Sequence, residues 1–263
     1  MCYKCIMNAS KSTKIKPLLN DWKPHTVATS EWLSTRGITP QDVRNYLGSN
    51  WLTSLGRGAF KRPNETVTWQ GALHSLQKQL GLPIHVGALT ALEMTGHQHY
   101  VRLGTSTAFL FSSPDTKLPK WFRNNWGGEV RHFPTKLFPA LMSVTVRQSP
   151  EGLSLICSTP EQAILEMLHL TPAEFDPVEV AQIIESMTSL RPKEMQELLE
   201  ACSSIKAKRL FLYLAERANL RLVNSLDLTK IDLGKGKRAI TAKGRLSPKY
   251  DLLLPEELVS NVS

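Results

Sequence analysis

Residues 39–47 constrain the fold more than any other stretch, because they define both the start and the two faces of a short helix. Thr39 is a favourable N-cap, and Pro40 fits the first helical position, where no backbone donor is needed. Asp42, three residues after the cap, can return the capping interaction. The apolar face of this helix would consist of Val43, Tyr46 and Leu47. The sequence therefore predicts a helix over residues 40–49 with a polar outer face.

That outer face carries the residue types that read base edges in DNA. Arginine can hold guanine through two acceptors, and glutamine or asparagine can hold adenine. A helix over residues 11–22 and a shorter one after a cap at Thr29 or Ser30 are predicted upstream, and Gly37 provides a tight turn before the third helix. A helix that follows such a turn is how a helix-turn-helix reaches the major groove. The expected DNA-reading residues are Thr39, Gln41, Arg44, Asn45 and Ser49.

A basic hairpin is predicted directly after this module. Gly56 and Gly58 flank Arg57 and can adopt the positive φ of a tight turn, which places Arg57 at the tip. Lys61 and Arg62 would lie on the descending strand. Such a hairpin can reach the minor groove or neighbouring phosphates, so the module is predicted to be a winged helix-turn-helix. The alternative is a small helical module that serves only for protein contacts.

The distribution of charge favours a polyanionic partner. The formal net charge is +9, but residues 1–80 carry eleven basic and four acidic side chains, whereas residues 151–204 carry two and ten. Residues 81–150 and 205–263 are again basic, with seven against three and twelve against six. Polyanions are held by such patches through counterion release. Charge alone is equally compatible with the solvated surface of an ordinary soluble protein.

The remaining two thirds predict a second domain. A helix over residues 69–80 ends at Gly81, and a step at Pro83 separates a DNA-binding domain, residues 1–82, from a second domain, residues 83–263. Short β-rich segments indicate an antiparallel sheet, and apolar stripes indicate several later helices. The expected strands lie at residues 100–103, 107–111, 128–132, 142–147 and 153–157, and the helices at 86–95, from 160 onward, 177–188, 192–203 and 211–218. The fold class is α+β.

No enzymatic, metal or cofactor site is predicted. Glu194, Glu197 and Glu200 recur every three residues on one helix face with no histidine or aspartate converging on them, so the acids of residues 161–200 are expected to be solvated. Cys2 and Cys5 form a C-x-x-C without two further ligands nearby. The other cysteines, Cys157 and Cys202, are too scattered for a disulfide framework. His97 and His99 are expected to be surface residues rather than metal ligands.

A second basic region near the C-terminus has two open interpretations. Its glycine-rich loop, residues 234–238, could grip phosphates or could be a solvated hairpin. The cations concerned are Lys235, Lys237, Arg238, Lys243, Arg245 and Lys249. No run approaches the roughly 18 apolar residues of a membrane span, and the N-terminus lacks an apolar signal core, so a cytoplasmic protein with no membrane partner is expected.

Several of these segments, in this order, resemble the AbiEi antitoxins over about residues 25–255. The matching segments include Leu55-Gly56-Arg57-Gly58-Ala59-Phe60 and Gly244-Arg245-Leu246-Ser247-Pro248-Lys249-Tyr250, together with residues 29–33, 37–38, 48–52, 67–73, 80–87, 90–93 and 233–238. The resemblance implies a type IV antitoxin and autorepressor. Its functional partner would be an AbiEii-like nucleotidyltransferase toxin that it does not bind directly.

A single module makes few base contacts, so tight repression is expected to need two copies on an inverted repeat in the promoter, with self-association on double-stranded DNA. The rival interpretation is a nucleic-acid- or nucleotide-handling enzyme that uses the helix-turn-helix only for targeting.

Overall fold

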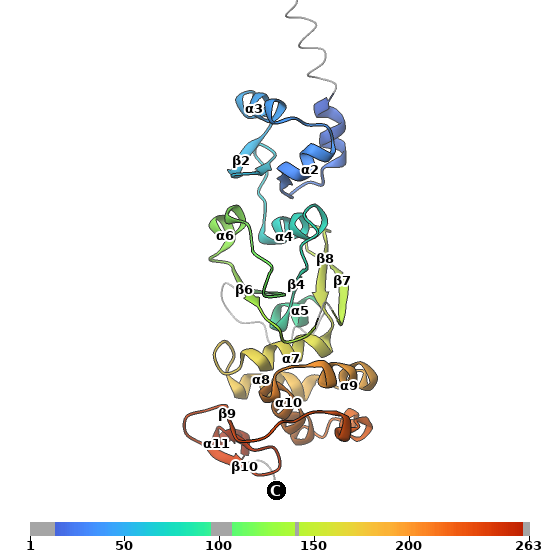
Figure 1. Cartoon of the computed structure of the whole chain (residues 1–263), viewed down its shortest axis with the longest axis vertical. Coiled ribbons are helices and arrows are strands. Elements are labelled where there is room, and N and C mark those ends of the chain that lie inside the picture. Colours follow the sequence, from blue (N-terminus) through green and yellow to red (C-terminus); the bar gives the residue numbers. More distant parts are fainter. Residues whose placement is uncertain (1–13, 96–106, 140–141, 260–263) are drawn as a thin grey trace, which may run out of the picture. The chain divides into compact units, whose positions relative to one another are not determined.

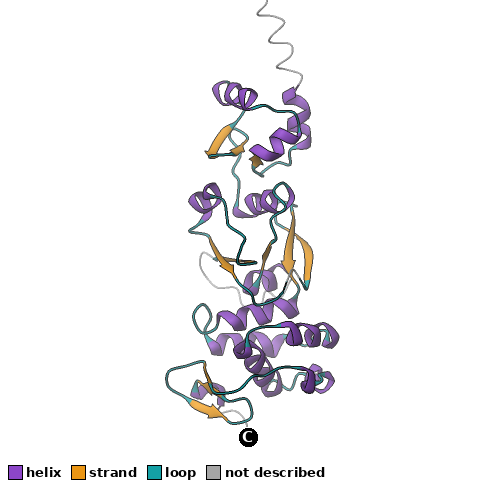
Figure 2. Ribbon diagram, viewed as in Figure 1, coloured by secondary structure: helices purple, strands orange, loops and turns teal. Residues whose placement is uncertain are grey.

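The computed structural model describes residues 14–95, 107–139 and 142–259, and it confirms the α+β fold class (Figures 1 and 2). Contacts divide the chain into two compact units. The first comprises residues 1–84, 116–131 and 148–155, and the second comprises residues 85–115, 132–147 and 156–263. Each unit is therefore assembled from separate stretches of chain. The domain boundary expected after Leu82 stays a prediction.

The first unit opens with the element order of a winged helix-turn-helix, which confirms the predicted helices and hairpin. The elements are a helix over residues 14–21, β1 (Ala28–Thr29), α2 (Ser30–Thr35), α3 (Pro40–Gly48), β2 (Thr53–Gly56) and β3 (Ala59–Lys61). Strand β3 lies between β1 and β2 and is antiparallel to both. Trp22, Leu33, Tyr46 and Leu52 form the centre of a dry core beneath these elements.

Two further helices, α4 (Trp69–Lys78) and α6 (Lys120–Trp126), belong to the same unit. Ser75 of α4 hydrogen-bonds both the N–H and the carbonyl of Val27, at 3.0 and 2.8 Å. A side chain at Gly71 would meet the carbonyl of His25, so only glycine allows this close approach. Helix α6 was not predicted. Its Trp126 indole donates to the carbonyl of Val67 at 3.2 Å, which ties it to the segment before α4.

A five-stranded sheet supports the second unit. Its strand order is β6 (Val130–Pro134), β5 (Ala108–Ser112), β4 (Ile84–Val86), β8 (Ser154–Ser158) and β7 (Val144–Gln148). Strands β4 and β8 run parallel, with Val86 opposite Cys157. The sheet is therefore mixed, which corrects the expectation of a purely antiparallel one. Strand β4, its central member, was not predicted because three residues between Pro83 and Gly87 are too few to show a period.

Five helices of this unit pack against one another, and the first of them also packs against strand β5 of the sheet. They are α5 (Ala88–Met94), α7 (Pro160–Leu170), α8 (Pro177–Ser186), α9 (Pro192–Ala201) and α10 (Ile205–Arg217). Helix α7 is central, with contacts to the other four. Helices α7, α8 and α9 begin at Pro160, Pro177 and Pro192, which confirms the predicted starts. Proline is favourable at the first position of a helix. None of the described helices is long and apolar enough to cross a membrane.

The chain ends in a small sheet that the sequence pattern did not reveal. Two 3-10 turns, η2 (Arg221–Ser225) and η3 (Leu228–Lys230), lead to β9 (Arg238–Ala239), β10 (Arg245–Ser247), β11 (Leu252–Leu254) and α11 (Glu256–Val259). Strand β11 lies between β10 and β9. The features predicted at residues 11–13, Cys2, Cys5, His97, His99 and the strand at 100–103 lie outside the described residues.

Candidate nucleic-acid interface

Helix α3 is held by a complete capping box. The Thr39 hydroxyl accepts from the N–H of Asp42 at 3.1 Å, and the Asp42 carboxylate accepts from the N–H of Thr39 at 3.0 Å. The backbone hydrogen bond from Thr39 is the main reason that the pKa of Asp42 lies below its usual value, and Lys14 adds an ion pair at 3.3 Å. Thr39 therefore fixes the start of the helix, and its hydroxyl is already engaged.

The outer face of α3 brings the predicted base-reading side chains into one hydrogen-bonded group. The guanidinium of Arg44 donates to the side-chain oxygen of Gln41 at 2.6 and 3.2 Å, and the Gln41 amide donates to Asn45 at 3.4 Å. Gln41, Arg44 and Ser49 are exposed and Asn45 is half-buried. The Ser49 hydroxyl donates to the carbonyl of Asn45 at 2.7 Å. Hydrogen-bond donors and acceptors thus lie side by side on an accessible surface.

Leu47 differs from the expectation that it would face the core. It is 37% exposed, and the nearby Trp51 is 47% exposed, whereas Tyr46 is buried and Val43 only partly so. The apolar face of α3 is therefore narrower than its sequence suggests. Of the apolar side chains of this nine-residue helix, Tyr46 is the one that is buried.

The wing turn places Arg57 at an exposed tip, as expected. Gly56 and Gly58 have φ values of +135° and +80°, which L side chains rarely adopt. Gly56 pairs with Ala59 across the turn, and the carbonyl of Gly58 accepts from the N–H of Ser30 at 2.9 Å. The turn is thereby joined to the start of α2, so Arg57 is presented from a fixed backbone.

Lys61 and Arg62 are engaged inside the first unit. Arg62 is half-buried, pairs with Glu65 at 3.3 Å, and donates to the carbonyls of Leu19, at 2.7 Å, and Trp22. The ammonium of Lys61 donates to the carbonyl of Glu65 at 2.8 Å. Arg62 therefore ties the loop after β3 to the first helix, whereas Lys61 bonds within that loop. Their positions in the sequence suggested a basic strand, but Arg62 turns toward carbonyls some forty residues upstream and Lys61 toward a carbonyl four residues downstream.

The basic C-terminal region presents four of its six predicted cations freely. Arg209 is buried beneath the loop and donates to the carbonyls of Leu233, Gly234, Gly236 and Tyr250 at 2.7–3.2 Å, which turns the loop carbonyls inward. Arg238 is half-buried against carbonyls of its own loop, and Lys249 pairs with Glu216 at 2.6 Å. The exposed cations without a hydrogen-bond partner among the described residues are Lys235, Lys237, Lys243 and Arg245.

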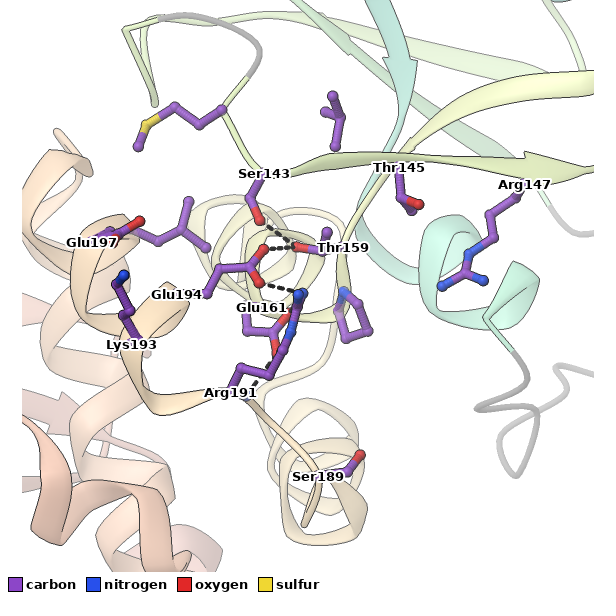
Figure 3. A pocket seen from close by; sticks show the side chains of 14 residues that line it. Ser143, Thr145, Arg147, Thr159, Glu161, Ser189, Arg191, Lys193, Glu194 and Glu197 are labelled. Carbon is purple, nitrogen blue, oxygen red and sulfur yellow. Dashed lines mark hydrogen bonds and ion pairs between the residues drawn. The ribbon is translucent and has the colours of Figure 1, made fainter.

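Two acidic side chains of the second unit are buried, contrary to the expectation of solvated helix faces. One is Glu161, which lines a groove of about 850 Å³ (Figure 3). Burial alone would raise the pKa of Glu161, but hydrogen bonds from the side chain and backbone of Arg191 outweigh this and lower it. Glu194, on the same wall, accepts from the Thr159 hydroxyl at 2.9 Å and pairs with Arg191. These carboxylates therefore join α7 to α9.

The other is Glu166, which lies at the centre of a polar cluster inside the second unit. It accepts from Ser158 at 2.9 and 3.0 Å, from the Gln162 amide at 2.8 Å and from the N–H of Ala88 at 2.9 Å, and it contacts His85 at 2.7 Å. The Glu166 carboxylate lies between the Ser158 hydroxyl and the His85 imidazole. In a catalytic triad the imidazole lies between the hydroxyl and the carboxylate, so the order here is different. No metal-binding group of three or more His, Cys, Asp or Glu occurs among the described residues.

The sequence signal for the burial of Glu166 was present but ambiguous. Glu166 lies one turn after Gln162 on α7, on the face that turns toward β4 and α5, and a polar pair at this spacing is more often exposed. Only the arrival of His85 and the N–H of Ala88, about 80 residues upstream, makes burial favourable.

Comparisons with known proteins point in one direction. A family model described as "Transcriptional regulator, AbiEi antitoxin, Type IV TA system" matches residues 105–255, and the model of the AbiEi antitoxin N-terminal domain matches residues 11–103. No curated protein matches the chain significantly. Among solved structures, the crystal structure of the RV2827C protein from Mycobacterium tuberculosis is similar in fold, with a TM-score of 0.62 and 17% identity over 96% of this chain and 94% of that one.

Proposed function

Because this chain belongs to the AbiEi family of transcriptional regulators, the antitoxins of type IV toxin-antitoxin systems, we propose that it represses its own promoter by binding inverted repeats through α3 and the wing. The observation that supports this best is the exposed group of Gln41, Arg44 and Asn45 on a capped helix beside a fixed hairpin tip. Gln41, Arg44, Asn45 and Ser49 would lie in the major groove, and Arg57 would hold the minor groove or adjoining phosphates.

Not every predicted DNA-contacting residue stays in the proposed interface. Thr39 acts as the N-cap that orients α3, because its hydroxyl is already bonded to Asp42. Lys61 and Arg62 shape the base of the hairpin, because their charged groups are bonded to Glu65 and to carbonyls of the first helix. We therefore leave these three residues out of direct contact with DNA.

Substitution on α3 and at the wing tip tests the interface. Arg44→Ala should relax base preference at one operator position by about 1–3 kcal/mol, and Arg57→Gln should weaken binding to all duplexes alike. Binding to the promoter fragment and to point-substituted fragments would be measured by fluorescence anisotropy at fixed salt. Arg221→Ala, an exposed arginine of the second unit, is the matched control. Normal promoter binding by the Arg44→Ala/Arg57→Gln double variant would contradict the proposal.

Two copies on an inverted repeat are part of the same proposal. One α3 offers four side chains for base contacts, which is few for tight repression, and two-fold operators match pairs of such modules. Footprinting should reveal two protected half-sites that fill together. Full occupancy of one unrepeated half-site by a monomer would count against it.

We assign neutralisation of a nucleotidyltransferase-like toxin to the second unit, without direct binding of the toxin. The support is the set of exposed cations: Lys235 and Lys237 lie on a loop whose carbonyls bind Arg209, Lys243 lies just before β10, and Arg245 lies at its start. Replacing all four by glutamine should abolish rescue of cells from the toxin and leave promoter binding intact. Arg44→Ala should impair promoter recognition and leave rescue intact. A stable complex of antitoxin and toxin during purification would overturn the indirect mechanism.

A further inference from the structure

The wing turn is backed by α6, a helix some 65 residues further along the chain and part of the same unit. A Cβ placed on Gly56 would lie 3.0 Å from the Cβ of Trp121. The side-chain amide of Asn125 donates to the carbonyl of Leu55 at 2.8 Å and to that of Trp121 at 2.7 Å. Strand β2 therefore ends against α6, and the two elements form one continuous support for the wing tip.

A hollow of about 490 Å³ lies where the wing turn, the start of α2 and the start of α6 meet. Arg57 and Lys120 both line it, together with Asn124, and the acidic residue on its wall is Glu31. The wing arginine thus has a second cation as its neighbour on the same surface, supplied by α6 rather than by the hairpin itself.

Helix α6 is amphipathic, with its aromatic side chains buried and its charged side chains exposed to solvent. Trp121, Phe122 and Trp126 are buried, whereas Lys120 and Arg123, three residues apart, are exposed. Neither the Lys120 ammonium nor the Arg123 guanidinium has a hydrogen bond or ion pair with another described residue. The segment 116–131 carries four basic side chains and one acidic side chain, so its surface is strongly cationic.

We propose that α6 is a second DNA-contacting element, in which Lys120 and Arg123 bind the phosphates next to those reached by Arg57. This inference depends on the proposed DNA binding by α3 and the wing. A duplex carries one phosphate per about 1.7 Å of its axis, so a cation that borders the same hollow as Arg57 meets the adjoining backbone. Phosphate contacts fix position and carry no sequence information, so α6 strengthens binding without changing the preferred operator.

The test is the salt dependence of binding by the full chain. The double variant Lys120→Gln/Arg123→Gln should reduce the slope of log affinity against log salt by about 0.9 for each lost contact, on the promoter and on an unrelated duplex alike. The ratio of the two affinities should stay unchanged. Lys193→Gln/Arg221→Gln removes two exposed charges from the second unit and should leave the slope as in the wild type.

Lysine acetylation provides a second measurement that does not depend on affinity. Lys120 should be acetylated more slowly in the presence of duplex DNA, and Lys193 should not. The inference is wrong if the slope of the α6 variant equals that of the control and Lys120 stays unprotected. If Arg44→Ala still alters base preference in that case, DNA contact by α6 is excluded and the proposed function of α3 stands. If the wild-type chain binds neither duplex, both this inference and the proposed function fail.

Discussion

Glu166 joins several elements in the interior of the second unit. Its carboxylate takes hydrogen bonds from Ser158, Gln162 and the backbone of Ala88, and His85 is its fourth partner. These partners come from β8, α7, α5 and β4, so one buried charge connects four elements. A buried charge of this kind is tolerated only because every partner is present.

Glu166→Ala should therefore lower the free energy of unfolding by about 3–5 kcal/mol, because it leaves several buried donors unpaired. Glu166→Gln should have a smaller effect, since the amide keeps one acceptor. Urea denaturation followed by circular dichroism measures both. Glu200→Ala, on the exposed face of α9, is the control and should stay within about 0.5 kcal/mol of wild type. Equal stability of the Glu166 and Glu200 variants would contradict the assignment.

The pair formed by Glu161 and Arg191 predicts a pH dependence. Arg191 holds the pKa of the buried Glu161 carboxyl below its usual value despite the opposing effect of burial. A carboxyl whose pKa is lower in the folded state stabilises the protein above its unfolded pKa of about 4.3, and this contribution disappears as the pH falls through the folded value.

Arg191→Gln should therefore cost about 1–3 kcal/mol at pH 7, where the carboxylate loses its charged partner. The difference from wild type should shrink as the pH falls through the lowered pKa of Glu161, below which this carboxyl is protonated in both proteins. Urea midpoints at a series of pH values measure this. A difference that stays constant down to pH 3 would show that Arg191 acts through something other than the charge of Glu161.

At the scale of elements, the wing is the clearest case in which neighbouring cations have different tasks. Arg57 is exposed at the tip, whereas Arg62 joins the end of the hairpin to the carbonyls of Leu19 and Trp22. Arg62→Met should therefore destabilise the first unit by about 1–3 kcal/mol, because two carbonyls and Glu65 lose a charged donor. Arg57→Gln should leave stability within about 0.5 kcal/mol. Thermal unfolding separates the two, and equal melting temperatures would exclude an anchoring role for Arg62.

Elements with local signals were predictable, and elements without them were not. Some elements were found because their signals lie within about four residues of the structure they specify. These signals are the capping box at Thr39, the glycines of the wing and the prolines that open α7, α8 and α9. Helix α6 and strand β4 have seven and three residues and follow Pro119 and Pro83, so neither is long enough to show a period. They form because distant segments cover them.

At the scale of the whole molecule, the division into units affects how the two functions are separated. The first unit contains residues 116–131 and 148–155 as well as residues 1–84. A chain that begins at residue 81 would lose β2 and Val67, which contact α6, and would expose Trp121 and Trp126. Large apolar side chains exposed in this way favour aggregation.

The truncated chain should therefore be insoluble or bind a hydrophobic dye strongly, whereas the full-length variant Arg44→Ala/Arg57→Gln should stay folded and monodisperse. Dye fluorescence and gel filtration make the comparison. If the truncated chain is soluble and folded cooperatively, α6 does not need its partners in the first unit, and truncation becomes a valid way to isolate the antitoxin function.

The sequence by itself determined the winged helix-turn-helix, the polar outer face of α3 and the tip position of Arg57, because caps, turns and helical periodicity depend on neighbouring residues. Only the tertiary structure decided that Arg62 turns inward, that Glu161 and Glu166 are buried, and that α6 supports the wing. Each of these depends on a partner some 30 to 80 residues away. A side chain is buried or exposed according to which distant donors and acceptors reach it, and no local pattern carries that information.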